Sequence, residues 1–239
     1  MTIHLITSPP FGERFWTLVQ QRMMHHGYEV SIHTPMEHHY SMEKMVEQLS
    51  LVITHNDSVV AHGLGVPLLL AFANAHRIKH AFISNGPLKN LDPLCSTFSK
   101  LPLSAQQLYL HPRISFRYFR SSLGMRRSVV NPYVMDEETV STVCAPLQNA
   151  ATRKNMALYL VEIASFEPPY KIDAPLTLIW GDHDLLYPIS VCTEIQTRYP
   201  HSQRFDIEGG KIFHPIERPW AIADIIHNQL STASISQNL

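Results

Sequence analysis

Residues 57–71 constrain the fold of this chain most strongly, because they combine a strand, a sharp turn and a helix within a short span. Two adjacent valines favour a buried strand. Gly63 and Gly65 then supply a turn that needs positive φ or close backbone approach. Pro67 suits the first turn of a helix, where a missing N–H costs little. The unit places one residue at its tip, above helix N–H groups that can bind a carbonyl oxygen or an anion.

Strand-like and helix-like segments alternate on both sides of this unit. We expect strands at 3–8, 28–33, 79–84, 176–180 and 204–208, and helices at 13–26, 41–54 and 218–230. A chain of 239 residues is long enough for one such core. The alternation predicts an α/β fold built on a mostly parallel, doubly wound sheet with right-handed crossovers.

A central segment interrupts the alternation and predicts a helical cap. Turn residues and irregular apolar positions fill 85–170, without the strand signals found elsewhere. We therefore expect an α/β core made of 1–88 and 171–230, and a helical cap inserted at 89–170. The polar residues 231–239 predict a frayed, disordered tail.

The cap segment is rich in arginine and poor in acid. No acidic residue occurs between Asp92 and Asp136. Arg113, Arg117 and Arg120 are spaced to share one helix face. A solvated basic face is one interpretation, and a docking patch for an anionic ligand tail or an acidic partner is the other.

Composition argues against several classes of protein. A formal net charge of -1 gives no reason to expect nucleic acid or a membrane surface as a partner. The longest apolar run, residues 66–73, is too short to span a bilayer. Three widely spaced cysteines and a start without signal-peptide features predict a cytoplasmic protein with reduced thiols. Adjacent histidine pairs and the missing third glycine of a dinucleotide motif lead us to expect no metal and no cofactor.

Three motifs resemble those of the α/β-hydrolase family. Residues 61–65, Ala-His-Gly-Leu-Gly, resemble its nucleophile elbow Gly-x-Ser-x-Gly. Residues 181–188 match its acid loop Gly-x-x-Asp-x-x-x-Pro, which implies that Asp184 occupies the position that orients a catalytic histidine. Residues 209–219 resemble its final segment, which implies Ile212 at the histidine position and His214 two residues later. The resemblance spans nearly the whole chain and implies the α/β-hydrolase fold with a helical cap.

The same resemblance implies a degenerate catalytic triad. Gly63 stands where the family has its nucleophilic serine, and Ile212 stands where it has the base. The first loop, 7–10, lacks the family's His-Gly pair. The oxyanion hole is then expected to shrink to the N–H of Leu64, alone or with that of Phe11. An ordinary serine hydrolase is not expected.

Three functions remain open at this point. The favoured one is a hydrolase-fold protein that binds an apolar or carbonyl-bearing small molecule between core and cap. It would be catalytically silent, or would promote a rearrangement, elimination or cyclisation by orientation and exclusion of water. The second is an esterase- or thioesterase-type hydrolase with a relocated mechanism, in which Asp184 and His214 are the catalytic residues. The third is an interaction module that docks through the arginine-rich cap. The expected ligand-binding residues are Ser8, Phe11, His62, Gly63, Leu64 and Ile212.

Overall fold

A single parallel sheet organises the protein. In a computed structural model, which describes residues 1–9, 11–89 and 93–236, the strands run in the order β2-β1-β3-β4-β5-β6 and every neighbouring pair is parallel. The strands are β1 (Thr2–Ile6), β2 (Glu29–His33), β3 (Ser58–His62), β4 (His80–Ser84), β5 (Leu176–Gly181) and β6 (Gln203–Ile207). The prediction of a parallel, doubly wound α/β sheet is confirmed.

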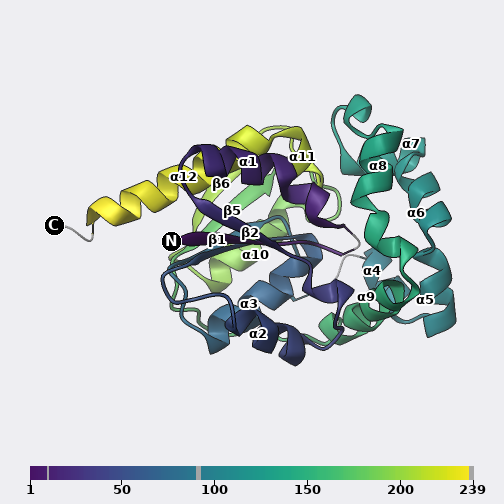
Figure 1. The fold of residues 1–239 in the computed structure, drawn as a ribbon, viewed down its shortest axis with the longest axis horizontal. Helices are drawn as coiled ribbons and strands as arrows, with labels where there is room; N and C mark the ends of the chain where they lie inside the picture. Colours follow the sequence, from purple (N-terminus) through teal and green to yellow (C-terminus); the bar gives the residue numbers. More distant parts are fainter. Residues whose placement is uncertain (10, 90–92, 237–239) are drawn as a thin grey trace.

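The central strands are buried because helices cover both faces of the sheet (Figure 1). Every residue of β3, β4 and β5 is buried, as expected for strands with no solvated face. α1 (Thr17–His25) packs with α12 (Pro219–Ser236) on one side, and α2 (Met42–Ser50) packs with α3 (Val66–Ala75) on the other. α10 (Ile189–Arg198) and the short α11 (His214–Glu217) complete the core.

The segment between β4 and β5 forms the cap, at the end of the molecule toward which the strands run (Figure 1). Its helices are α4 (Pro93–Ser99), α5 (Leu103–Tyr109), α6 (Pro112–Phe119), α7 (Ser122–Ser128), α8 (Glu137–Val143) and α9 (Ala150–Ile163). Aromatic rings join cap to core, since Phe11 lies 5.7 Å from Phe119 and 4.8 Å from Phe213 between ring centroids. The Gly12 N–H also donates to the Val143 carbonyl at 3.0 Å.

The C-terminal helix is longer than the sequence suggested. α12 continues through Ser236, so the expectation of a disordered tail from residue 231 is wrong for 231–236. A buried stripe of Ile222, Ile226 and Leu230 anchors the helix, and no proline or glycine follows to end it. Residues 237–239 lie outside the described part, as do Pro10 and residues 90–92 at the start of the expected cap. No helix in the described part is both long enough and apolar enough to cross a membrane.

Candidate functional site

The turn after β3 has the sharp geometry that its glycines predict. Gly63 adopts φ +53°, a left-handed conformation that residues with a Cβ avoid. A Cβ on Gly65 would lie 2.9 Å from the carbonyl oxygen of Thr7. The short 3₁₀ turn Gly63–Gly65 then runs into α3, and this places the Leu64 N–H at the start of the helical segment.

Ser8, from the loop after β1, fills the space at the tip of this turn. Its Oγ accepts a hydrogen bond from the Leu64 N–H at 3.0 Å. A Cβ added to Gly63 would lie only 2.5 Å from the same oxygen. The Phe11 N–H, the second donor expected from sequence, donates to the Ser8 carbonyl at 2.8 Å. Both expected oxyanion donors therefore bind Ser8, and the Ser8 hydroxyl is the polar group nearest the tip.

His214 does not face the tip of the turn. It is fully buried, and its Nδ1–H donates to the Lys211 carbonyl at 2.7 Å. That bond fixes the tautomer, so Nε2 accepts from the Ser84 hydroxyl at 2.8 Å. Burial lowers the pKa of His214 to about 4. Both ring nitrogens are committed to partners other than Asp184, and the imidazole is neutral at physiological pH.

His62 lies below the turn and joins the same buried network. Its Nδ1 is 3.3 Å from the Ser84 hydroxyl, and its ring centroid is 5.3 Å from that of His214. The Phe15 ring packs against it at 4.8 Å. Burial, followed by the nearby His214, lowers the pKa of His62 well below its usual value. We assign this residue to the support of the turn rather than to ligand contact.

Asp184 is held by its own loop and by the end of β4. Its Oδ1 accepts from the Leu186 N–H at 2.7 Å and from the Tyr187 N–H at 3.1 Å. Its Oδ2 accepts from the Asn85 side-chain amide. These bonds hold the acid loop closed and join it to the end of β4, so the carboxylate stabilises the fold.

Asn85 is the important residue that sequence reasoning missed. It has φ +41°, the one positive value at a non-glycine position in the part of the chain described. Besides the bond to Asp184, its Oδ1 accepts from the Gly181 N–H at 2.8 Å, and its backbone carbonyl accepts from the Gly63 N–H. A signal was present in the Asn-Gly pair directly after a buried strand, because asparagine tolerates the left-handed conformation.

We expect Asn85→Ala to lower the free energy of unfolding by about 3 kcal/mol, because it leaves a buried carboxylate oxygen and a buried N–H without this partner. Urea unfolding of the purified variant measures the loss. Asn74→Ala, at an exposed position, is the matched control and should change stability by less than about 0.5 kcal/mol. A loss at Asn85 no larger than in the control would mean that this side chain does not hold the three segments together.

An apolar cavity lies between the turn and the cap. It has a volume of about 490 Å³, and none of the described residues that line it is charged. Leu64 and Pro9 border it on the core side, and Met156 and Leu160 of α9 form one wall. Other cap residues complete the lining: Cys95, Thr97, Phe98, Leu101, Tyr109, Leu110 and Tyr118. Of the six expected ligand-binding residues, Leu64 alone belongs to this lining. The others are buried and lie outside it: Ser8, Phe11, His62, Gly63 and Ile212.

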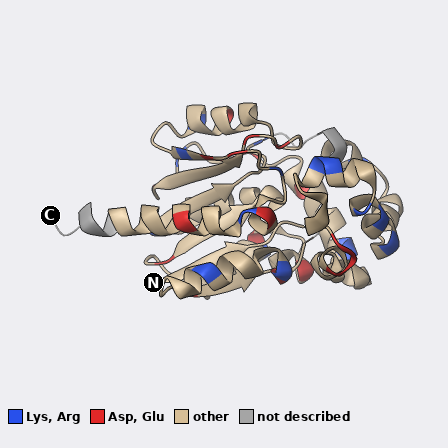
Figure 2. Cartoon of the chain, turned by 90° about the horizontal axis from the view of Figure 1, so that it is seen from above, with Lys and Arg blue, Asp and Glu red and all other residues tan. Residues whose placement is uncertain are grey.

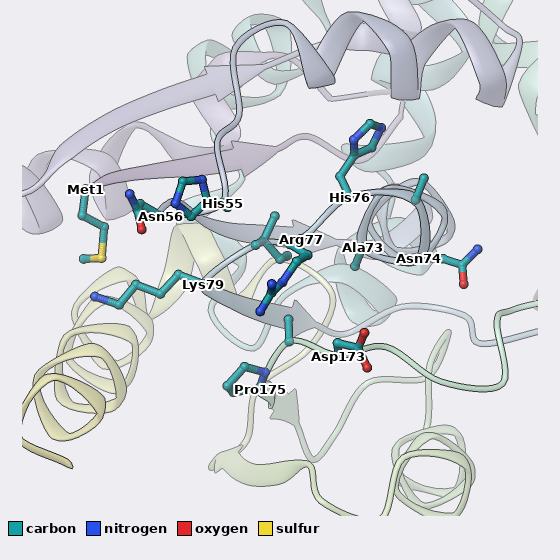
Figure 3. Close-up of a pocket in the computed structure, with 13 residues that line it drawn as sticks. Met1, His55, Asn56, Ala73, Asn74, His76, Arg77, Lys79, Asp173 and Pro175 are labelled. Atoms are coloured by element: carbon teal, nitrogen blue, oxygen red, sulfur yellow. The ribbon is translucent and has the colours of Figure 1, made fainter. Parts of the chain in front are cut away.

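A larger hollow lies at the opposite edge of the sheet (Figure 3). It measures about 750 Å³ and is lined by residues that precede β3, β4 and β5, among them Arg77, Lys79 and Asp173. None of the motif residues is there. Ligands of open parallel sheets bind beyond the carboxyl ends of the strands, which is where the core–cap cavity lies. The core–cap cavity is therefore the candidate ligand site.

Solved structures resemble this one over nearly its full length. The Cif epoxide hydrolase from Acinetobacter nosocomialis superposes with a TM-score of 0.78 at 13% identity, covering 95% of this chain and 81% of that one. MenH from S. aureus gives 0.77 at 11% identity over 98% and 94% of the two chains. A carboxylesterase structure from Nitrososphaera gargenis gives 0.77 at 13% identity over 98% and 91%. The chain has the α/β-hydrolase fold. No protein-family model and no curated protein sequence matches it.

The turn after β3 is the segment whose sequence resembles the nucleophile elbow, and Gly63 lies at its tip. The nearest hydroxyl comes from Ser8 on a different loop, and the one histidine of the final motif is turned toward Ser84. In the described residues, no group of three or more histidine, cysteine or acidic side chains is placed to hold a metal ion. The arrangement offers a shaped apolar cavity bordered by Leu64, whose N–H is bonded to the Ser8 hydroxyl.

Proposed function

We propose that this protein binds an apolar, carbonyl-bearing small molecule in the core–cap cavity and does not act as a serine hydrolase. The observation that carries the proposal is Ser8 Oγ in the space of a nucleophile side chain, held there by the Leu64 N–H. A ligand carbonyl would accept from the Ser8 hydroxyl, which now donates to the neighbouring Pro9 carbonyl at 3.2 Å. The hydrogen bond from Leu64 makes that hydroxyl a better donor.

The chemistry open to such a site is limited. Attack on an ester needs a nucleophile within hydrogen-bonding reach of a base, whereas both nitrogens of His214 are engaged elsewhere. What remains is orientation of the ligand and exclusion of water, which accelerate a rearrangement, elimination or cyclisation within the ligand itself. Tyr159 of α9 supports the cavity, because its hydroxyl donates to the Leu64 carbonyl at 2.7 Å.

We expect the wild-type protein to show neither hydrolysis of fluorogenic acyl esters and thioesters nor covalent labelling by a fluorophosphonate. Plate fluorescence and intact-protein mass spectrometry measure the two. Turnover that His214→Ala abolishes would support the alternative hydrolase mechanism through Asp184 and His214 and would sink the binding proposal. Labelling at Ser8 would do the same, because it would show an activated nucleophile.

Binding itself is tested with a ketone and a cavity-filling variant. A medium-chain methyl ketone should bind saturably in calorimetry, and the alkane of equal length should bind about tenfold more weakly, because it cannot accept the Ser8 hydrogen bond. Leu101→Trp fills the cavity and should abolish binding, since Leu101 is part of its lining. Leu108→Trp is the matched control, because that side chain is exposed and lies outside the lining. Equal binding by both variants would place the ligand elsewhere.

A further inference from the structure

A second hollow lies on the cap, away from the core–cap cavity. It is formed by α6 together with α8 and the residues that follow α8, and its volume is about 360 Å³. We call it the α6 hollow. It is lined by Pro112, Arg113, Phe116, Arg117, Ser141, Cys144 and Gln148. No residue is shared with the lining of the core–cap cavity, so the two are separate places on the molecule.

The charge of the α6 hollow is entirely positive. Arg113 and Arg117 lie one turn apart on α6, and none of the described residues that line the hollow is acidic. In the part of the chain described, neither guanidinium group makes a hydrogen bond or an ion pair. Arg120 differs, because its side chain donates to the Met135 carbonyl at 3.0 Å. Figure 2 shows further Lys and Arg positions, in blue, along the ribbon at the cap end of the molecule.

The rest of the lining suits an apolar group next to the charge. Phe116 lies between the two arginines in sequence and presents an aromatic ring to the hollow. Cys144 is buried, and burial raises the pKa of its thiol to about 12, so it stays neutral and does not repel an anion. Ser141 and Gln148 add neutral hydrogen-bonding groups at the rim.

We propose that the α6 hollow binds an oxyanion carried on an apolar group. The oxyanion lies between Arg113 and Arg117, whose forked donors match the oxygens of a phosphate or a carboxylate. The apolar group packs on Phe116. The proposal develops the anionic-partner expectation for the arginine face and narrows it to two of the three arginines. It does not depend on the proposed function of the core–cap cavity.

Calorimetric titration at low salt tests the proposal, with phenyl phosphate and benzoate as probes. Saturable binding of at least one of the two is expected, and the tighter one identifies the preferred headgroup. Inorganic phosphate should bind about fivefold more weakly than phenyl phosphate, since it lacks contact with Phe116. Benzyl alcohol, which has the ring without the charge, should not bind. If inorganic phosphate binds as tightly as phenyl phosphate, the role given to the Phe116 ring is wrong.

The matched variants are two double substitutions of equal charge. Arg113→Gln with Arg117→Gln should weaken binding of the tighter probe by about tenfold or more, because both forked donors are lost. Arg126→Gln with Arg127→Gln removes the same charge from α7, outside the hollow, and should change binding by less than about twofold. Equal weakening by the two pairs would overturn the proposal, because it would show a diffuse attraction to basic surface. Binding that is not saturable would overturn it as well.

Discussion

The protein should unfold cooperatively on acidification between pH 6.5 and pH 4. Burial lowers the pKa of His33, His80 and His214 to about 4, whereas the same side chains titrate near 6.5 in an unfolded chain. Below pH 6.5 the unfolded state therefore binds more protons, and stability is lost as the pH falls toward 4. Each histidine contributes on the order of 3 kcal/mol to this loss. Three together reach the order of the whole unfolding free energy of a domain.

Tryptophan fluorescence against pH, with urea unfolding at several pH values, measures the effect. His80→Gln keeps a partner for the Thr177 hydroxyl, which lies 2.8 Å from the His80 ring, but it does not titrate in this range. Its unfolding should take up about one proton fewer than that of the wild type near pH 5. Asn74→Gln, at an exposed position, is the control for substitution as such, because it neither adds nor removes a titratable group, and it should leave the proton count unchanged. An unchanged count in His80→Gln would mean that His80 is not held neutral by the fold.

Gly63→Ser should strongly destabilise the fold unless Ser8 is replaced by a smaller residue at the same time. Gly63→Ser places a Cβ 2.5 Å from Ser8 Oγ and forces a left-handed residue to carry a side chain. We expect it to cost about 3 kcal/mol of unfolding free energy, from overpacking and backbone strain together. Ser8→Gly combined with Gly63→Ser should recover about 2 kcal/mol of that loss, because only the strain remains.

A double-mutant cycle by urea unfolding gives this coupling energy. Gly27→Ser is the matched control for strain alone, because Gly27 also has positive φ but a Cβ there would meet nothing within 4 Å. It should cost about 1 kcal/mol and should add to Ser8→Gly without coupling. Additive behaviour of Ser8→Gly and Gly63→Ser would contradict the assignment of Ser8 to the nucleophile's space.

The fold could be predicted from sequence because its signals are local. Alternating strand and helix segments, the glycines of the elbow and the acid loop each determine a short stretch of backbone, and the parallel sheet follows from their order. The arginine spacing predicted one face for three arginines. Arg113 and Arg117 do line the same hollow, whereas Arg120 follows the end of α6 and its side chain donates to the Met135 carbonyl. Such patterns do not show which side chains meet across the molecule.

The site was harder to predict because its decisive contacts join distant residues. Ser8 and Leu64 are 56 positions apart, and Asn85 and Asp184 are 99 apart. Spacing along the chain gives no measure of either contact. The orientation of the His214 ring depends on its loop, and that loop is bonded to the cap. The Phe213 N–H donates to the Ser128 carbonyl in the cap at 2.9 Å. A motif comparison places His214 near the site but does not give the orientation of its ring.

The bonds made by Asp184 also bear on how hydrolase-like genes are recognised. Asp184 closes its own loop and joins that loop to the end of β4 through Asn85, so its presence is explained by the fold without a catalytic task. A survey that scores sequences by their matches to triad motifs would count Asp184 as a catalytic acid. The informative test of such a gene is whether the carboxylate oxygens are hydrogen-bonded to a histidine or to neighbouring loops of the fold.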